Sequence, residues 1–258
     1  MPKLLVLAQI LLFATYANAH CSLIDIHGSN NKVGHAFGVD LNGKYPRKVG
    51  QPGDAGGDSG VFQTGTNNPS PPCGSTPELG QLDVVSWLSQ AEGSGLPAAH
   101  PNGSIVALAF QVNRDGGGPM ICEYNEDATA KSFKPMKMIL NQSGNNGVGN
   151  LLRVNETVVM QFPTGAKCTG GWTETACIIR CRTGVNKRFG GCFAAKLAGT
   201  QAPIRTVCGG PRTRQSSRKP KPKIMSKGKP KANKKHNTKT SKVKPHAKRD
   251  DSRDVISS

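Results

Sequence analysis

Eight cysteines behind an export leader are the feature that most limits what this chain can fold into. Residues 1–19 contain Lys3, an apolar run over residues 4–13 and the small-x-small sequence Ala17-Asn18-Ala19. This three-part pattern predicts a signal peptide. We expect cleavage after residue 19 and a secreted, extracellular chain that begins at His20. In an oxidising compartment an even number of cysteines predicts disulfide bonds.

The cysteines of the mature chain are expected to form four disulfides. Their connectivity stays open, because eight cysteines allow about 105 pairings. Zinc binding is the alternative use of cysteine, and the sequence disfavours it because it has no Cys-x-x-Cys pair. Three Asn-x-Ser/Thr sequons, at Asn102, Asn141 and Asn155, predict N-glycosylation. The predicted disulfide cysteines are Cys21, Cys73, Cys122, Cys168, Cys177, Cys181, Cys192 and Cys208.

Charge divides the chain into two regions. Residues 211–258 hold seventeen Lys and Arg against three Asp, whereas residues 20–210 hold sixteen Lys and Arg against thirteen Asp and Glu. The C-terminal region has no cysteine and no aromatic residue, so we expect it to be disordered. The predicted organisation is a signal peptide (1–19), a secreted β-sandwich domain (20–210) and a disordered Lys/Arg-rich tail (211–258).

The basic tail favours polyanionic partners, which Lys-rich segments attract by counterion release. The candidate polyanions are nucleic acid, anionic lipid and acidic polysaccharide or another acidic surface. Nucleic acid is disfavoured, because the tail has no aromatic side chain to stack on bases. A tail that only improves solubility is the alternative. Beyond the leader no run of eighteen apolar residues occurs, so we expect no membrane span, and we expect a monomer.

The domain is expected to be mainly β: an antiparallel, disulfide-stapled β-sandwich with long loops. The 31 glycines, 18 prolines and 5% aromatic content argue against a helical bundle. Short apolar runs predict strands, and 83–90 predicts one short helix. The Gly-rich segment 50–73 predicts an irregular loop anchored by a disulfide. The expected strands are residues 105–112, 137–140, 157–162, 176–182 and 191–197.

Two short patterns that suggest catalysis are interpreted as structural. Gly57-Asp58-Ser59-Gly60 has the sequence found around the serine of chymotrypsin-like proteases. Only 24 residues separate His35 from Ser59, too few for a double-barrel protease, so a Gly-rich turn is the better interpretation. The carboxylate pairs Asp54/Asp58 and Glu123/Glu126 are interpreted as surface groups, because closeness in sequence does not place two carboxylates across a cleft.

His20 suggests a metal site. An N-terminal histidine offers its α-amine and an imidazole nitrogen, and a second imidazole would complete a three-nitrogen site suited to Cu(II). Secreted copper-dependent lytic polysaccharide monooxygenases use this arrangement on an immunoglobulin-like β-sandwich. Spacing does not choose the second ligand among His27, His35 and His100. The candidate metal ligands are His20 and His100. His236 and His246 lie in the tail, which is expected to be disordered.

Three blocks of the sequence resemble the fungal Egh-like family, also called MAS-type, of secreted proteins linked to appressoria and host penetration. They are FQVNRDGGGPMICEY (110–124), CTGGWTETACIIRCR (168–182) and RFGGCFAAKL (188–197). The resemblance implies a secreted virulence factor that acts early in host invasion and has no assigned catalysis. The chain is therefore expected to bind wall or cuticle material; the alternative is a copper-dependent monooxygenase-like enzyme that uses His20.

The chain departs from the family pattern at two positions. It has His20-Cys21 where His-Gly is usual, and Phe110 where a histidine often precedes Gln-Val-Asn. If that histidine is the second copper ligand, Phe110 removes it. The departures favour the binding function over the enzyme. Phe189 and Phe193, which flank Cys192, are expected to pack in the core.

Overall fold

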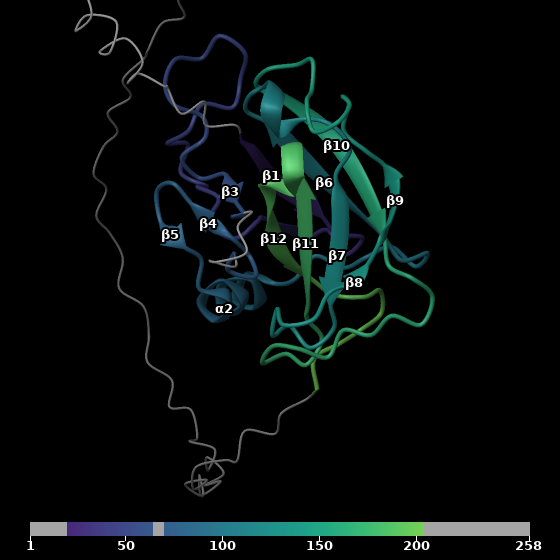
Figure 1. Ribbon diagram of the computed structural model, residues 1–258. Coiled ribbons are helices and arrows are strands. Elements are labelled where there is room, and N and C mark those ends of the chain that lie inside the picture. The colour runs from purple at the N-terminus through teal and green to yellow at the C-terminus, as the bar shows by residue number, and fades with distance from the viewer. Residues whose placement is uncertain (1–19, 64–69, 204–258) are drawn as a thin grey trace, which may run out of the picture. The chain divides into compact units, whose positions relative to one another are not determined.

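A computed structural model of the chain describes residues 20–63 and 70–203, which form two antiparallel β-sheets and one α-helix (Figure 1). The predicted signal peptide, the basic tail and Cys208 lie outside the described residues. Within the described residues, no helix is long and apolar enough to cross a membrane.

The strands form two sheets whose neighbouring strands all pair antiparallel. Sheet A has the order β2-β1-β6-β10-β9 and sheet B the order β5-β4-β3-β12-β11-β7-β8. In sheet A the strands are β1 (Cys21–His27), β2 (Val33–Gly34), β6 (Ser104–Gln111), β9 (Lys137–Leu140) and β10 (Val154–Gln161). In sheet B they are β3 (Gly60–Val61), β4 (Ser75–Thr76), β5 (Gly80–Gln81), β7 (Ile121–Asn125), β8 (Lys134–Pro135), β11 (Cys177–Thr183) and β12 (Phe189–Ala195).

The helix α2 (Val84–Ser94) covers part of sheet B. Asp83 precedes it and its side chain accepts a hydrogen bond from the backbone N–H of Val85, which satisfies one of the unpaired donors at the helix start. Leu88 on the helix packs in one apolar cluster with Ile178 and Ala194 of sheet B. The helix predicted at 83–90 is therefore confirmed and is longer than expected. Two short 3-10 helices, η1 (Arg114–Gly116) and η2 (Val185–Lys187), lie in loops.

The main core lies between the two sheets. It combines inward-facing residues of sheet A, such as Leu23 and Ala107, with residues of sheet B, such as Ile179 and Phe193. Phe193 is fully buried, and Phe189 packs in the same core, as expected. The predicted fold class, a mainly antiparallel β-sandwich with disulfides, is confirmed.

The five predicted strands are present as β6, β9, β10, β11 and β12, with bounds shifted by a few residues. Strand β1 was not predicted, because a β-bulge between Leu23 and Asp25 breaks its alternation. The buried residues Leu23 and Ile26 are consequently three apart in sequence instead of two. Strand β7 was also missed, since only Cys122 and Tyr124 mark its inward face.

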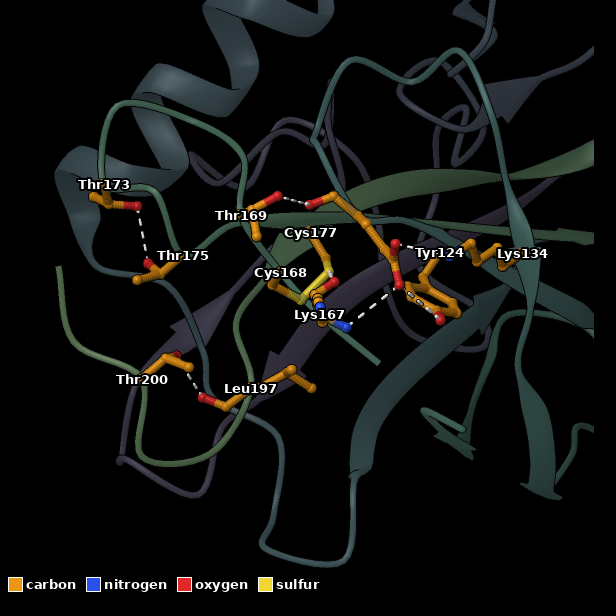
Figure 2. Close-up of a disulfide and its surroundings, with 11 residues drawn as sticks. Tyr124, Lys134, Lys167, Cys168, Thr169, Thr173, Thr175, Cys177, Leu197 and Thr200 are labelled. Atoms are coloured by element: carbon orange, nitrogen blue, oxygen red, sulfur yellow. Dashed lines mark hydrogen bonds and ion pairs between the residues drawn. A yellow bond between two sulfur atoms is a disulfide. The ribbon is translucent and has the colours of Figure 1, made fainter. Parts of the chain in front are cut away.

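Three disulfides connect elements that are distant in sequence or close a loop. Cys73–Cys192 ties the loop before β4 to β12, and Cys122–Cys181 joins register partners on β7 and β11. Figure 2 shows the third, Cys168–Cys177, beside Lys167 and Thr169 at the start of β11. Segment 50–63 is largely irregular and Cys73 is disulfide-bonded, as predicted for 50–73.

Cys21 has no disulfide partner among the described residues, and Cys208 lies outside them. Its thiol is fully buried at the start of β1, 3.6 Å from Oε1 of Gln142. Burial raises the pKa of the Cys21 thiol to about 12. Only the thiolate is nucleophilic, so the folded chain should not react at this residue.

We expect iodoacetamide at pH 8 to leave Cys21 unmodified in the folded protein and to modify it once the chain is unfolded without reductant. Peptide mass spectrometry after each treatment measures this. Alkylation of Cys21 in the native state would contradict its burial. Absence of alkylation in denaturant would instead indicate a disulfide at Cys21.

Candidate functional site at the His20 end of the sandwich

The strand register brings four loops to one end of the sandwich. Cys21 pairs with Gln111, which pairs with Val154, so β1 and β10 begin where β6 ends. In sheet B, Ile121 pairs with Arg182, so β7 begins where β11 ends. We call this end the His20 end and define it by loops 47–58, 112–120, 141–153 and 184–188.

Hydrogen bonds connect these loops to one another. The Arg153 guanidinium donates to the carbonyls of Gln51 and Gly53. The backbone N–H of Gly149 donates to the Arg114 carbonyl at 2.7 Å, and that of Gly118 to the Ser143 carbonyl at 2.8 Å. Loops 47–58, 112–120 and 141–153 are therefore held as one surface, which limits the entropy lost when a ligand binds.

His20 itself is buried at this end, with 2% of its surface exposed. Its backbone nitrogen donates to Oδ1 of Asn113 at 3.1 Å, and its ring lies 5.9 Å from that of Phe189. The backbone of Gly56 packs directly on the imidazole: a Cβ there would lie 2.6 Å from Nδ1. Only glycine fits at this position.

The other described histidines lie elsewhere. His100 precedes β6, at the end opposite His20, and the eight residues of β6 separate them by roughly 25 Å at about 3.4 Å per residue. His27 ends β1, and His35 contacts the middle of that strand, with Nδ1 2.7 Å from the Ile24 carbonyl. The structure does not bring the candidate ligands His20 and His100 together.

The groups around His20 do not fit the three-nitrogen copper site. The position expected to carry a second imidazole is Phe110, which is fully buried opposite Ser22, with the Arg47 guanidinium 5.0 Å from its ring. Within residues 20–63 and 70–203 no cluster of three His, Cys, Asp or Glu is arranged to hold a metal ion. Nothing at His20 therefore favours the copper-dependent alternative.

The Gly-Asp-Ser-Gly motif forms part of a buried polar network. Asp58 is 1% exposed, pairs with the Arg47 guanidinium and accepts from the Asp40 backbone N–H at 2.9 Å. The hydroxyls of Ser59 and Ser22 are 2.6 Å apart. The motif is structural, as expected. The interpretation of Asp58 as a surface carboxylate is wrong, because Asp58 is buried and pairs with Arg47 of the same irregular loop, a contact that no periodic pattern predicts.

A second polar contact fixes the start of loop 47–58. The Tyr45 ring lies against Gly57, where a Cβ would come within 2.4 Å of it, and the Tyr45 hydroxyl donates to Glu78. Hydrogen bonds from Lys44 and Tyr45 lower the pKa of the Glu78 carboxyl. Burial and the bond to Glu78 raise the pKa of Tyr45, so it remains a neutral donor at physiological pH.

Cations outnumber acids at the His20 end. Its four loops contain six Lys and Arg against three Asp, whereas the loops at the opposite end (28–32, 95–103, 126–133, 162–176 and 196–203) contain four Lys against three acids. Large apolar side chains are exposed there as well: Val49, Leu151, Leu152 and Val185. The sequence did not reveal this surface, because its loops are far apart along the chain.

The three sequons differ in accessibility. Asn102 and Asn155 are exposed, and Oδ1 of Asn102 accepts from the Ser104 hydroxyl of its own sequon at 2.7 Å. Asn141 is half-buried: its Nδ2 donates to the Met120 carbonyl at 2.9 Å and its Oδ1 accepts from the Met120 N–H at 2.8 Å. A glycan on Asn141 would disturb both bonds.

We therefore expect N-glycans at Asn102 and Asn155 and none at Asn141 when the chain passes through a eukaryotic secretory pathway. Glycopeptide mass spectrometry measures the occupancy. Asn155→Gln should remove one glycan from the intact mass, whereas Asn141→Gln should leave the glycan mass unchanged. A glycan found on Asn141 of the folded protein would contradict the prediction.

Comparisons with known proteins point to one family. A family model described as Egh16-like virulence factor matches residues 18–190. The appressoria-specific virulence factor GAS1 of Pyricularia oryzae is 35% identical over 138 residues, which are 50% of this chain and 55% of that protein. The appressoria-specific virulence factor GAS2 of the same fungus is 31% identical over 130 residues, 48% of this chain and 44% of that protein. The chain thus spans about half the length of the curated relatives it matches, and no solved structure matches it significantly.

Proposed function

Because the chain belongs to the Egh16-like virulence factor family, we propose that it is a secreted protein of host-surface penetration that binds acidic wall or cuticle polysaccharide through its His20 end. The role that we propose is binding. The two relatives described as appressoria-specific virulence factors support a role in host penetration. The three disulfides within the described residues suit an extracellular setting.

The observation that carries the proposal is the surface chemistry of the His20 end. Lys48, Arg114 and Arg188 are exposed there beside the apolar side chains of Leu151 and Val185. Cations pair with the carboxylates of uronic acid sugars, and aliphatic side chains pack on the C–H faces of sugar rings. The hydrogen bonds that join the loops prepare this surface for a ligand.

The basic tail would add to this affinity. Residues 211–258 carry seventeen Lys and Arg against three Asp, which attract any polyanion in a salt-dependent way. The tail therefore supplies general attraction to an acidic wall, whereas the His20 end supplies contacts of fixed geometry.

Binding to polygalacturonate tests the proposal, with fully methyl-esterified pectin and chitin as uncharged controls. Two forms are compared at rising salt concentration: residues 20–258 and residues 20–210. Both forms should bind polygalacturonate in preference to the controls, and the shorter form should show the weaker salt dependence. Equal binding to esterified pectin, or loss of all binding with the tail, would overturn the proposal.

Two matched double variants test which end of the sandwich contacts polygalacturonate. Lys48→Gln with Arg188→Gln removes two exposed cations from the His20 end, and Lys131→Gln with Lys167→Gln removes two from the opposite end. We expect the first pair to weaken binding of residues 20–210 about five- to tenfold and the second to have little effect. Equal effects of the two pairs would contradict a located site.

A further inference from the structure

The outer face of sheet B is cationic near the His20 end. Side chains alternate along β11, so Cys181 points into the core between the sheets while Arg180 and Arg182 share the opposite face. Further along that face, Ile178 is covered by the apolar cluster beneath α2. Sheet B thus presents a covered apolar half and a half that carries two guanidinium groups.

One carboxylate serves both guanidinium groups. Oε2 of Glu123 accepts from Nη2 of Arg180 at 3.0 Å and from Nη2 of Arg182 at 3.1 Å. Arg180 is also positioned by the Phe133 ring, 3.8 Å from its Cζ, and donates from Nη1 to the Pro72 carbonyl. Nε of Arg182 is buried and has no hydrogen-bond partner among the described residues. A buried donor without a partner costs free energy.

A polar hollow adjoins these groups. It has a volume of about 630 Å³, and Lys187 contributes a third cation to its lining. Among the described residues that line it there is no carboxylate; Gln63, Ser70 and Asn186 add amide and hydroxyl groups. The lining therefore combines net positive charge with hydrogen-bonding groups suited to sugar hydroxyls.

We propose that this hollow, which we call the Arg182 groove, binds the carboxylate of a uronic acid unit in an acidic polysaccharide chain. The inference rests on the proposed function and extends the binding surface from loop 184–188 of the His20 end onto the outer face of sheet B. Guanidinium groups bind carboxylates through paired hydrogen bonds, and both Arg180 and Arg182 line the hollow. A single sulfate or phosphate ion would occupy little of the hollow, whereas several sugar rings fit a volume of this size. Its polar lining does not suit an apolar ligand.

Glu123 competes with such a ligand for Arg180 and Arg182. Removing the Glu123 carboxylate should therefore raise the affinity for the ligand, whereas removing an arginine should lower it. Glu123→Gln removes the internal carboxylate and should tighten binding of polygalacturonate about threefold or more. Arg182→Gln should weaken it about tenfold, and Lys187→Gln should weaken it to a smaller extent. A residue with only a structural role would not give opposite effects in Glu123→Gln and Arg182→Gln.

The matched control is Glu126→Gln, which removes a carboxylate from Lys134 outside the groove, where the two groups are 2.7 Å apart. It should leave the affinity unchanged. Dissociation constants are measured by calorimetry on each variant of residues 20–258. Thermal unfolding first confirms that each variant is folded. If Arg182→Gln does not fold, Arg182→Lys replaces it. Arg182→Lys should also weaken binding, since an ammonium group cannot form the paired hydrogen bonds of a guanidinium.

The outcomes separate the groove from the proposed function. If the unchanged protein binds polygalacturonate but Glu123→Gln and Lys187→Gln leave the affinity unaltered, the groove is wrong and the proposed function stands. If the unchanged protein does not bind polygalacturonate, the proposed function fails and the groove with it. Competition by inorganic sulfate at concentrations equal to those of galacturonate units would show a simple anion site and overturn the assignment to a polymer.

Discussion

Replacing Cys73 and Cys192 together with alanine is expected to lower the free energy of unfolding by about 4–5 kcal/mol. This disulfide joins residues 119 apart, so it removes more freedom from the unfolded chain than a bond that closes a short loop. It also fixes the loop before β4 to β12, next to the sheet face that carries Arg180. Urea unfolding of residues 20–210, followed by circular dichroism, measures the change.

The Cys168–Cys177 disulfide provides the control. It spans only nine positions, and its replacement by two alanines should cost about 2–3 kcal/mol. Both double variants leave the other two disulfides in place. A larger loss for the short loop than for the long one would contradict the chain-entropy explanation.

Arg47→Met is expected to lower the free energy of unfolding by about 3–5 kcal/mol, because it leaves the Asp58 carboxylate buried without its cation. Asp58 is 1% exposed, and its remaining partner is the Asp40 backbone N–H. The loss should also loosen loop 47–58, whose Gly56 packs on the His20 ring. Thermal and urea unfolding report the stability.

The double variant Arg47→Met with Asp58→Asn should recover part of that loss, since no unpaired charge is then buried. Lys44→Met serves as the control: Lys44 also pairs with a carboxylate, that of Glu78, but is exposed to solvent, so its replacement should change stability much less. An additive double variant, or equal effects at Lys44 and Arg47, would contradict a buried ion pair at Asp58.

Sequence patterns predicted the regular strands. They missed strands in which the alternation of buried and exposed side chains is interrupted. Residues 137–140 and 105–112 were identified from apolar runs, and both are strands. Strand β1 was missed because its bulge moves Ile26 out of step with Leu23. No local pattern records a bulge, since its effect depends on the neighbouring strand.

The candidate site was less predictable than the fold. His20 was predicted to be the first mature residue, but its proposed partner His100 lies at the other end of β6, and only the strand register shows this. One signal for the Arg182 groove was present in the sequence: in ACIIRCR the two arginines alternate with Cys181, which places both on one sheet face. That Glu123 pairs with them, and that Gln63 and Ser70 line the same hollow, depends on contacts between segments distant in sequence.

The central claim is that the His20 end is the binding surface. Hydrogen exchange with and without polygalacturonate tests this claim most directly. Measured on residues 20–258 by mass spectrometry, the ligand should slow amide exchange in loops 47–58, 112–120, 141–153 and 184–188. Exchange in the opposite loops, 95–103, 126–133 and 162–176, should stay unchanged. Protection confined to those opposite loops, or no protection in any loop of the folded domain, would contradict the account.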